Sequence, residues 1–278
     1  GNDNYLKIHD FQNIQDTNKL MKKINSSSLT SLFEISKNID EKTELKSAIR
    51  IYEDLSVTDS NDKYQYVFPD FSFDKEIDLE NEYNGTLFYN TSGYQKLHST
   101  NIYEAQLNND FNFRSFNNIN FGIVSNYNFL LKNFNTYAEN SSVFDNNNDH
   151  DLFGTVLFNS ELPLKKITND NSTSFLRPKV QIKFSPTNGK DISSTGSRLS
   201  YDSLFSTNRI GRSDMVEEGK SLTLGLEYEK LNFANEELIE FNIGNVLKDK
   251  KNSSMPSISK LDQTRSDIVG NFIYNPNS

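Results

Sequence analysis

Hydrophobic and polar residues alternate strictly along much of this chain. In residues 221–229 one face carries Leu222, Leu224, Leu226 and Tyr228, and the other carries Ser221, Thr223, Gly225, Glu227 and Glu229. Successive side chains of a β-strand point to opposite faces, so this pattern predicts a strand with one apolar and one polar face.

The same period of two recurs elsewhere. The apolar positions are Ile119, Phe121, Ile123, Tyr127, Phe129 and Leu131 in 118–131, Leu152, Val156, Phe158 and Leu162 in 151–162, Val180, Ile182 and Phe184 in 178–184, and Ile268, Gly270, Phe272 and Tyr274 near the end. We predict about twelve strands, at residues 4–9, 28–38, 43–55, 63–75, 83–94, 99–114, 117–134, 150–164, 173–186, 219–232, 236–247 and 264–275. Many reach the roughly 9–11 residues that a tilted strand needs to cross a bilayer.

The predicted connections alternate in length. Short ones fall at 39–42, 76–82, 115–116, 165–172 and 233–235, and long ones at 10–27, 56–62, 135–149, 187–218 and 248–263. Outer-membrane barrels join their strands by short periplasmic turns and long external loops in this way. Residues 10–25 have some helical spacing, which leaves a short loop helix open there. We expect an all-β fold, an antiparallel transmembrane β-barrel segment that forms a partial barrel or curved open sheet.

Composition agrees with a barrel wall. Hydrophobic residues make up 35% of the chain, with 21 Phe and 13 Tyr, against roughly 45–50% apolar residues in soluble domains. A strand that is polar on its inner face lowers the apolar share in this way. The net charge of −9 and the interspersed bases give no basic patch, so nucleic acid is not an expected partner.

Sequence signatures of catalysis and metal binding are missing. The chain has no Cys, which excludes disulfides and thiol chemistry, and the three histidines at 9, 98 and 150 are isolated. The run DNNNDHD at 145–151 has oxygen ligands for a cation, but a solvated loop tip is the preferred interpretation. We therefore expect no enzyme activity, no cofactor and no metal.

Three segments resemble the C-terminal barrel domain of the LPS-assembly protein family LptD. They are KYQYVFPDFSF at 63–73, LRPKVQIKFSP with DSLFSTNRIGRSDMVEEGKSLTLGLEY within 176–228, and IGNVLKDKKNSSMPSISKLDQTRSDIVGNFIY at 243–274. The segments occur in family order. Met215 departs from the family pattern, because many relatives carry Arg after the Asp at 214, and the cysteines that some members use to pin the N-terminal domain are absent.

The resemblance implies an outer-membrane protein that transports LPS rather than a catalyst. It implies that residues 1–278 are a single domain from the middle of the barrel, with both ends cut from a longer protein and with the N-terminal jellyroll and terminal barrel strands absent. Expected partners are LPS, outer-membrane lipid, an LptE-like lipoprotein plug and, through the missing N-terminal domain, an LptA-like periplasmic bridge.

The family-like motif supplies the candidate site residues, with a structural role or contact with the plug or LPS. They are Arg177, Pro178, Asn208, Arg209, Gly211, Asp214, Gly219, Asp249, Lys250, Ser266 and Asp267. Arg50, Lys179 and Lys183 share the polar faces, where ordinary charge facing water is the simpler interpretation. Pro178 lies inside a predicted strand and cannot donate a ladder hydrogen bond, so we expect a bulge or a break in pairing there.

Two other interpretations stay open at this point. One is another outer-membrane barrel, such as a porin or an uptake receptor, which shares the alternation but not the LptD-like segments. The other is a soluble all-β binding module, for which long strands and alternating loop lengths are not required.

Overall fold

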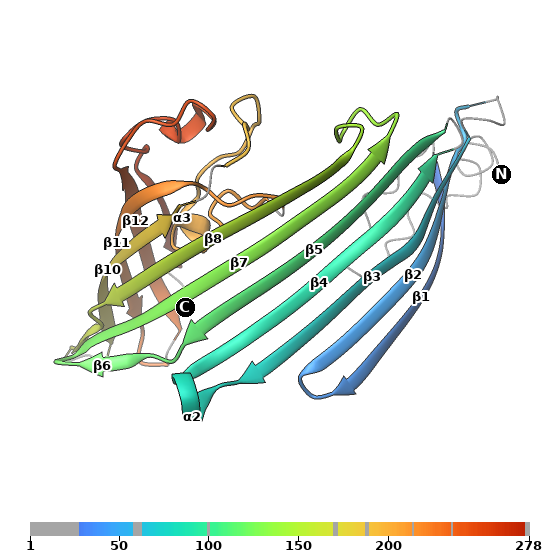
Figure 1. Cartoon of the computed structure of the whole chain (residues 1–278). Helices are drawn as coiled ribbons and strands as arrows, with labels where there is room; N and C mark the ends of the chain where they lie inside the picture. Colours follow the sequence, from blue (N-terminus) through green and yellow to red (C-terminus); the bar gives the residue numbers. More distant parts are fainter. Residues whose placement is uncertain are drawn as a thin grey trace. The chain divides into compact units, whose positions relative to one another are not determined.

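The computed structural model describes residues 28–57, 63–98, 101–168, 172–186, 189–212, 214–234 and 236–275. Within them the chain is nearly all β, with thirteen antiparallel strands in one open sheet (Figure 1). This confirms the predicted fold class. The strands are β1 Ser28–Asp40, β2 Thr43–Asp54, β3 Tyr64–Asp78, β4 Gly85–His98, β5 Ile102–Ser115, β6 Asn118–Asn120, β7 Ile123–Glu139, β8 Asn148–Glu161, β9 Leu164–Ile167, β10 Thr173–Ser185, β11 Gly219–Leu231, β12 Glu237–Lys248 and β13 Val269–Tyr274.

Strands that follow one another in sequence are neighbours in the sheet. The order is β1-β2-β3-β4-β5-β7-β8-β10-β11-β12-β13, with β6 paired to β7 and β9 paired to β10. Within the described residues, three short helices interrupt the connections: α2 Glu80–Tyr83, α3 Tyr201–Leu204 and the 3₁₀ turn η2 Ile258–Lys260. In the described part of the chain, no helix is long and apolar enough to cross a membrane.

The chain divides into two compact units. Unit 1 comprises Gly1–Glu76, Tyr89–Asn109 and Asn133–Asp151, and contains β1, β2 and most of β3. Unit 2 comprises Ile77–Phe88, Asp110–Lys132 and Leu152–Ser278, and contains β10 to β13. In unit 2 the long loops after β10 and β12 leave one end of the strands, and the short turn between β11 and β12 lies at the other end (Figure 1).

Strand boundaries differ from the predicted ones where turn residues sit inside an alternating pattern. The predicted strand 117–134 is two strands, β6 and β7, because Phe121 and Gly122 form a turn with positive φ angles of 51° and 80°. The predicted turn 165–172 contains most of β9, and the predicted loop 135–149 is shortened because β7 runs on to Glu139. Residues 95–98 belong to β4, and α2 occupies part of 76–82. The predicted strand 4–9 and the helical spacing at 10–25 lie outside the described residues.

Pro178 breaks the pairing on one side of β10 only. The register with β11 runs without interruption from Thr173 to Ser185. On the other side β8 pairs as far as Lys179 and β9 resumes at Leu176. The Pro178 carbonyl accepts the Leu162 N–H at 3.1 Å, so the backbone edge that lacks a donor faces β8 and β9. The expected break is confirmed, and β11 carries no bulge opposite it.

Burial in this chain is inverted relative to a soluble protein. On β10 the apolar side chains of Ile182 and Phe184 are 53% and 45% exposed, whereas the polar side chains of Gln181 and Lys183 are 0% and 2% exposed. In unit 1, Leu107 of β5 is likewise exposed, whereas the polar side chains of Glu104 and Asn108 on the same strand are buried. The sheet therefore has an exposed apolar face and an opposite polar face, and in unit 2 the polar face is covered.

Candidate functional site

The loop between β10 and β11 covers the polar face of β10–β12. Its helix α3 begins after Ser200, whose hydroxyl accepts the Ser203 N–H at 3.3 Å in a capping box. Tyr201 and Leu204 are the buried side chains of this helix. The helix lies against β12 and β13. A serine cap followed by two apolar residues thus makes a single helical turn that docks on the sheet.

Two glycines leave room for α3. A Cβ added to Gly244 of β12 would lie 2.4 Å from Leu204 Cδ2, and one added to Gly225 of β11 would lie 2.6 Å from Phe205 Cζ. Gly225 and Gly244 are direct partners in the β11–β12 register. They form a smooth patch on the polar face, where the loop approaches the backbone closely.

Polar contacts fix the loop around this patch. The Gln181 amide of β10 donates to the Phe205 carbonyl at 2.6 Å, and the Tyr201 hydroxyl donates to Glu227 Oε1 at 3.1 Å. Burial and then the Glu227 carboxylate raise the pKa of the Tyr201 hydroxyl. The proton therefore stays on Tyr201, and the hydroxyl remains a hydrogen-bond donor to β11.

A buried charge cluster holds the end of the same loop. Glu217 Oε2 lies 2.6 Å from Arg209 Nε and 3.6 Å from Lys183 Nζ, and Glu217 Oε1 lies 2.7 Å from Lys248 Nζ. None of these four side chains is more than 6% exposed. We call Lys183, Arg209, Glu217 and Lys248 the Glu217 cluster. It joins β10, the loop and β12 around one carboxylate.

The cations outnumber the carboxylate, and neutral acceptors take the remaining donors. The Arg209 guanidinium donates to Thr223 Oγ1 at 3.0 Å and to Ser221 Oγ at 2.6 Å. The Lys248 ammonium donates to the Leu261 carbonyl at 2.5 Å. Burial alone would raise the pKa of Glu217, but Arg209 and the two lysines outweigh it and hold that pKa well below its usual value. Glu217 is therefore ionised at neutral pH.

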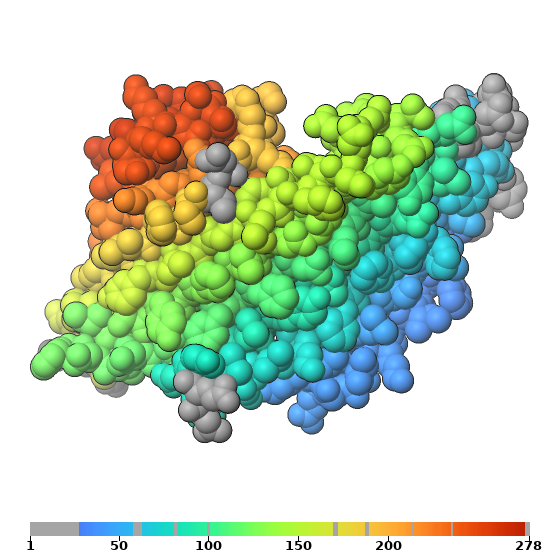
Figure 2. Space-filling view, viewed as in Figure 1, coloured from blue at the N-terminus to red at the C-terminus, as the bar shows by residue number. Residues whose placement is uncertain are grey.

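The loop after β12 packs on the loop between β10 and β11, which we call the first loop. Met255 and Leu261 are buried in it, and the Ile192 N–H of the first loop donates to the Ser254 carbonyl at 2.8 Å. The Asn252 amide donates to Glu218 Oε1 at 3.0 Å. Figure 2 shows the two loops in gold and red side by side. We call the described residues of 186–218 and 249–268 together the cap.

Comparison with known protein families decides the identity of this wall and cap. The family model LptD, described as LPS transport system D, matches residues 63–278. The chain belongs to the LptD family. A search of curated proteins finds no match. The resemblance predicted from the sequence is confirmed, and it covers most of the described strands and the whole cap of this LptD chain.

Family membership fixes the general class of function. LptD is an LPS transport family whose members are outer-membrane β-barrel proteins, not a family of enzymes. The exposed apolar face and the strand meander of the described residues agree with that class.

The structure brings most of the predicted site residues into the LptD cap or its rim. Arg209 is buried in the Glu217 cluster, the Asn208 amide donates to the Arg212 carbonyl, and Ser266 Oγ accepts the Val246 N–H at 2.9 Å. Asp214 binds Arg212 at 2.6 Å, and although burial raises the pKa of Asp214, this guanidinium lowers it overall. The predicted motif therefore lies largely in one place.

The remaining predicted residues have other roles. Gly211 and Gly219 adopt positive φ angles of 71° and 90°, which explains why glycine stands there. Asp267 makes an exposed ion pair with Lys260 at 2.9 Å, and Lys250 is exposed on the cap. Pro178 and Arg177 lie on β10 outside the cap.

On the polar face of β10 and β11 the charges form a ladder next to the cap. Arg177 Nη2 lies 2.9 Å from Glu229 Oε2, and Lys179 Nζ lies 2.8 Å from Glu227 Oε1. In the register Arg177 is opposite Glu227 and Lys179 is opposite Gly225, so both ion pairs join diagonal neighbours, which long charged side chains can reach. Arg177 and Lys179 are thus paired across the ladder.

Sequence reasoning missed Glu217 and Lys248. Both are charged residues near loop boundaries, where solvent exposure is the ordinary outcome. One signal was present: Glu217 follows Met215 and Val216, an apolar pair inside an otherwise polar loop, and both are buried. The apolar pair indicated a loop that folds inward.

The candidate cation segment is not a loop tip throughout. Residues 148–151 belong to β8, and His150 Nδ1 lies 2.9 Å from Asn135 Oδ1. Among the described residues, no group of three or more His, Asp or Glu side chains is arranged to hold a metal ion.

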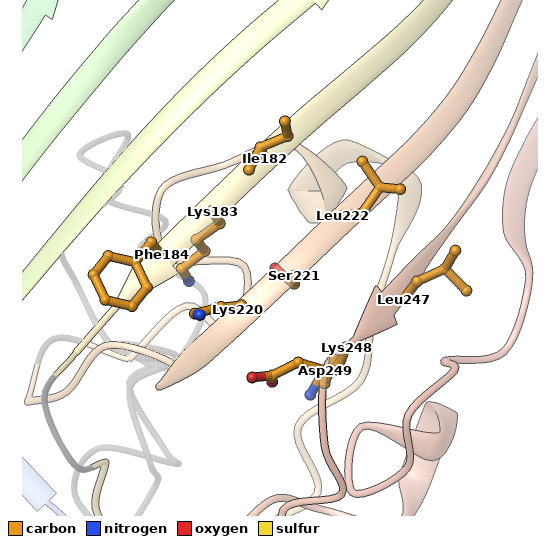
Figure 3. A pocket seen from close by; sticks show the side chains of 9 residues that line it. All are labelled: Ile182, Lys183, Phe184, Lys220, Ser221, Leu222, Leu247, Lys248 and Asp249. Carbon is orange, nitrogen blue, oxygen red and sulfur yellow. The ribbon is translucent and has the colours of Figure 1, made fainter.

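The apolar face carries a groove beside the LptD cap. It has a volume of about 720 Å³ and is lined by Ile182, Lys183, Phe184, Lys220, Ser221, Leu222, Leu247, Lys248 and Asp249 (Figure 3). Residues of β10, β11 and β12 contribute to it. The groove is open, and most of its exposed lining is apolar.

Proposed function

We propose that this chain forms part of the wall of the outer-membrane translocon that inserts LPS into the outer leaflet. The observation that carries the proposal is the inverted burial of the strands, with apolar side chains outward and polar side chains inward, in a chain of the LptD family. An outward apolar band and a polar interior are what a barrel in a bilayer requires.

The two faces match the two parts of LPS. A polar face offers water and hydrogen bonds to the sugars, whereas the apolar face satisfies the lipid around the wall. Paired strands leave few backbone groups without partners, which the hydrocarbon layer demands. In this account the apolar face of β10–β12 contacts membrane lipid, and the polar face borders the lumen.

Several charges on the polar face away from the cap are paired. In unit 1, Arg50 Nε lies 2.6 Å from Asp70 Oδ2, and Lys96 Nζ lies 2.9 Å from Glu104 Oε2. Paired charges hold LPS phosphates only weakly, so a sugar chain can pass without being trapped. Amide and hydroxyl groups would then provide most contacts along the path.

The cap is proposed to lie on the external side. Long loops are external and short turns periplasmic in barrels of this kind. Under this orientation the cap covers the outer end of the lumen next to β10–β12, and the turns at 165–172 and 233–235 face the periplasm. The motif residues gathered in the cap then close this end of the wall, and contact with LPS or a plug is open to Arg177 and Lys179.

The partners are proposed from family membership. They are LPS, outer-membrane lipid, an LptE-like lipoprotein in the lumen, and an LptA-like bridge reached through an N-terminal domain of the complete protein. In this proposal residues 1–278 are one domain from the middle of the barrel, and the described cap leaves the rest of the lumen for the plug.

A porin or uptake receptor would share the two faces but not the match to LptD over 63–278. A soluble all-β module would bury its apolar residues, whereas Ile182, Phe184 and Phe158 are each more than 40% exposed. The LPS-transport barrel is therefore the function that the observations favour.

Depletion of the full-length protein in its host tests this proposal. Surface LPS, measured by labelling intact cells, should fall as the protein is lost and return when the wild-type gene is restored. Unchanged surface LPS after depletion would rule out the transport role while leaving the barrel intact.

A further inference from the structure

The groove on the apolar face has a floor suited to hydrocarbon. Ile182, Leu222 and Leu247 lie on neighbouring strands, since Ile182 pairs with Leu222 and Leu222 pairs with Leu247. Figure 3 shows these three side chains along one side of the sheet. Three adjacent aliphatic residues give a continuous apolar strip at the end of the strands next to the cap.

One exposed cation stands at the end of this strip. Lys220 is the second residue of β11, is exposed, and its ammonium lies 5.8 Å from the centre of the Phe184 ring. The ammonium groups of Lys183 and Lys248 are held by Glu217 on the opposite face. Lys220 is therefore the cation that the groove presents to the membrane side.

Asp249 also lines the groove, is exposed and opposes an anion there. Lys250 and Lys251 follow Asp249 directly in the chain and are exposed, so the surface next to the groove adds two cations to Lys220. An apolar strip that ends at a basic rim complements an amphiphile with acyl chains and an anionic head. A free anion would leave the strip uncovered, and a neutral lipid would leave the ammonium without a partner.

We propose that this groove binds one phosphate-bearing membrane lipid, with its acyl chains on Ile182, Leu222 and Leu247 and its phosphate on Lys220. The inference rests on the proposed membrane location of the apolar face. The site lies outside the wall and is separate from any path through the lumen. A lipid held there would cover the outer side of β10–β12, whose inner side carries the cap.

Native mass spectrometry of the full-length protein in detergent micelles tests the site with dioleoyl phosphatidate as the probe. The Lys220→Gln variant should bind the first phosphatidate about fivefold more weakly than wild type, because one basic residue near a lipid surface contributes about that factor. Lys220→Arg should retain binding, since it keeps the charge. Equal binding by wild type and Lys220→Gln would overturn the proposal.

Matched probes and a control variant separate the alternatives. Dioleoylglycerol, which has the same chains without phosphate, and inorganic phosphate should both bind less than phosphatidate. If dioleoylglycerol bound as well as phosphatidate, the groove would be only an apolar contact. If inorganic phosphate bound as well, it would be only an anion site. Either result would overturn the lipid proposal.

Lys37→Gln is the control variant. It changes an exposed lysine opposite Leu45 on the apolar face of β1 and should have no effect on phosphatidate binding. A protein that takes up no detergent would contradict the proposed barrel itself. This result is distinct from a failure of the lipid site, in which the protein enters micelles but does not bind phosphatidate.

Discussion

At the scale of single residues, Glu217 is the carboxylate that three buried cations share. It is the one carboxylate in contact with Lys183, Arg209 and Lys248 in the described part of the chain. Removing one member of a buried ionic group leaves uncompensated charge in a medium that solvates it poorly. The docking of the first cap loop should therefore depend on this side chain.

We expect Glu217→Gln to destabilise the folded protein by about 3–5 kcal/mol, because three buried cations lose their counter-charge. Denaturant unfolding in micelles, with protease sensitivity of residues 186–218 as a local readout, measures the effect. Asp267→Asn is the control, since it breaks an exposed pair with Lys260 and should cost at most about 1 kcal/mol. Similar effects of the two substitutions would mean that the Glu217 cluster does not hold the cap in place.

The pH dependence of the cap follows from the lowered pKa of Glu217. A carboxyl whose folded pKa is depressed stabilises the fold above its unfolded pKa, and this contribution is lost as the pH falls through the folded pKa. The stability difference between wild type and Glu217→Gln should thus shrink as the pH falls below the ordinary value of 4.5. Unfolding titrations at a series of pH values measure this difference. A difference that already shrinks above that value would contradict the assigned pKa direction.

At the scale of elements, the position of α3 depends on two glycines of the sheet, whose lack of a side chain leaves room for the loop. Gly225 and Gly244 face Phe205 and Leu204 at distances that a Cβ would violate. The helix is a single turn and too short to be stable alone, so its position is set by packing. The glycine pair is therefore what allows the loop to dock on the sheet.

Gly244→Ala should push α3 away from β12 and destabilise the cap by about 1–3 kcal/mol, as overpacking of a tight contact does. Gly154→Ala in β8 is the matched control, because a Cβ there meets no atom within 4 Å. Protease cleavage within 189–212 should increase in the first variant and stay at the wild-type level in the second. Equal cleavage in both would mean that α3 does not rest on Gly244.

Much of the strand pattern could be predicted because a strand imposes its own period. The range 173–186 differs from β10 by one residue, and 219–232 differs from β11 by one residue. Phe121 continues the alternation of Ile119 and Ile123, so the pattern predicts it inside a strand, but it stands in a turn and is 96% exposed. The Glu217 cluster could not be predicted, since its members come from separate segments and only folding of the loop brings them together.

At the scale of the whole molecule, the account depends on which face meets lipid. Leu224→Arg, on the apolar face of β11, should cost about 2–4 kcal/mol when charge enters the bilayer midplane. The preceding residue, Thr223, lies on the polar face but cannot serve as the control position, because its side chain is completely buried against Arg209. Glu240→Arg on the polar face should be tolerated, since it places a cation opposite Glu229. Refolding titrations measure the free energy of unfolding of both variants. Equal losses of stability would contradict the assignment of the apolar face to lipid and the polar face to the lumen.

The absence of cysteine in this chain permits the most direct test of the inside-out wall. Single cysteines placed at Leu107 and Phe111 on the apolar face of β5, and at Gln106 and Asn112 on its polar face, can be labelled in native outer membranes. The account predicts alternation: a membrane-soluble maleimide labels positions 107 and 111, and a membrane-impermeant charged maleimide labels 106 and 112. Labelling of all four positions by the charged reagent would contradict a wall with lipid on one side and water on the other.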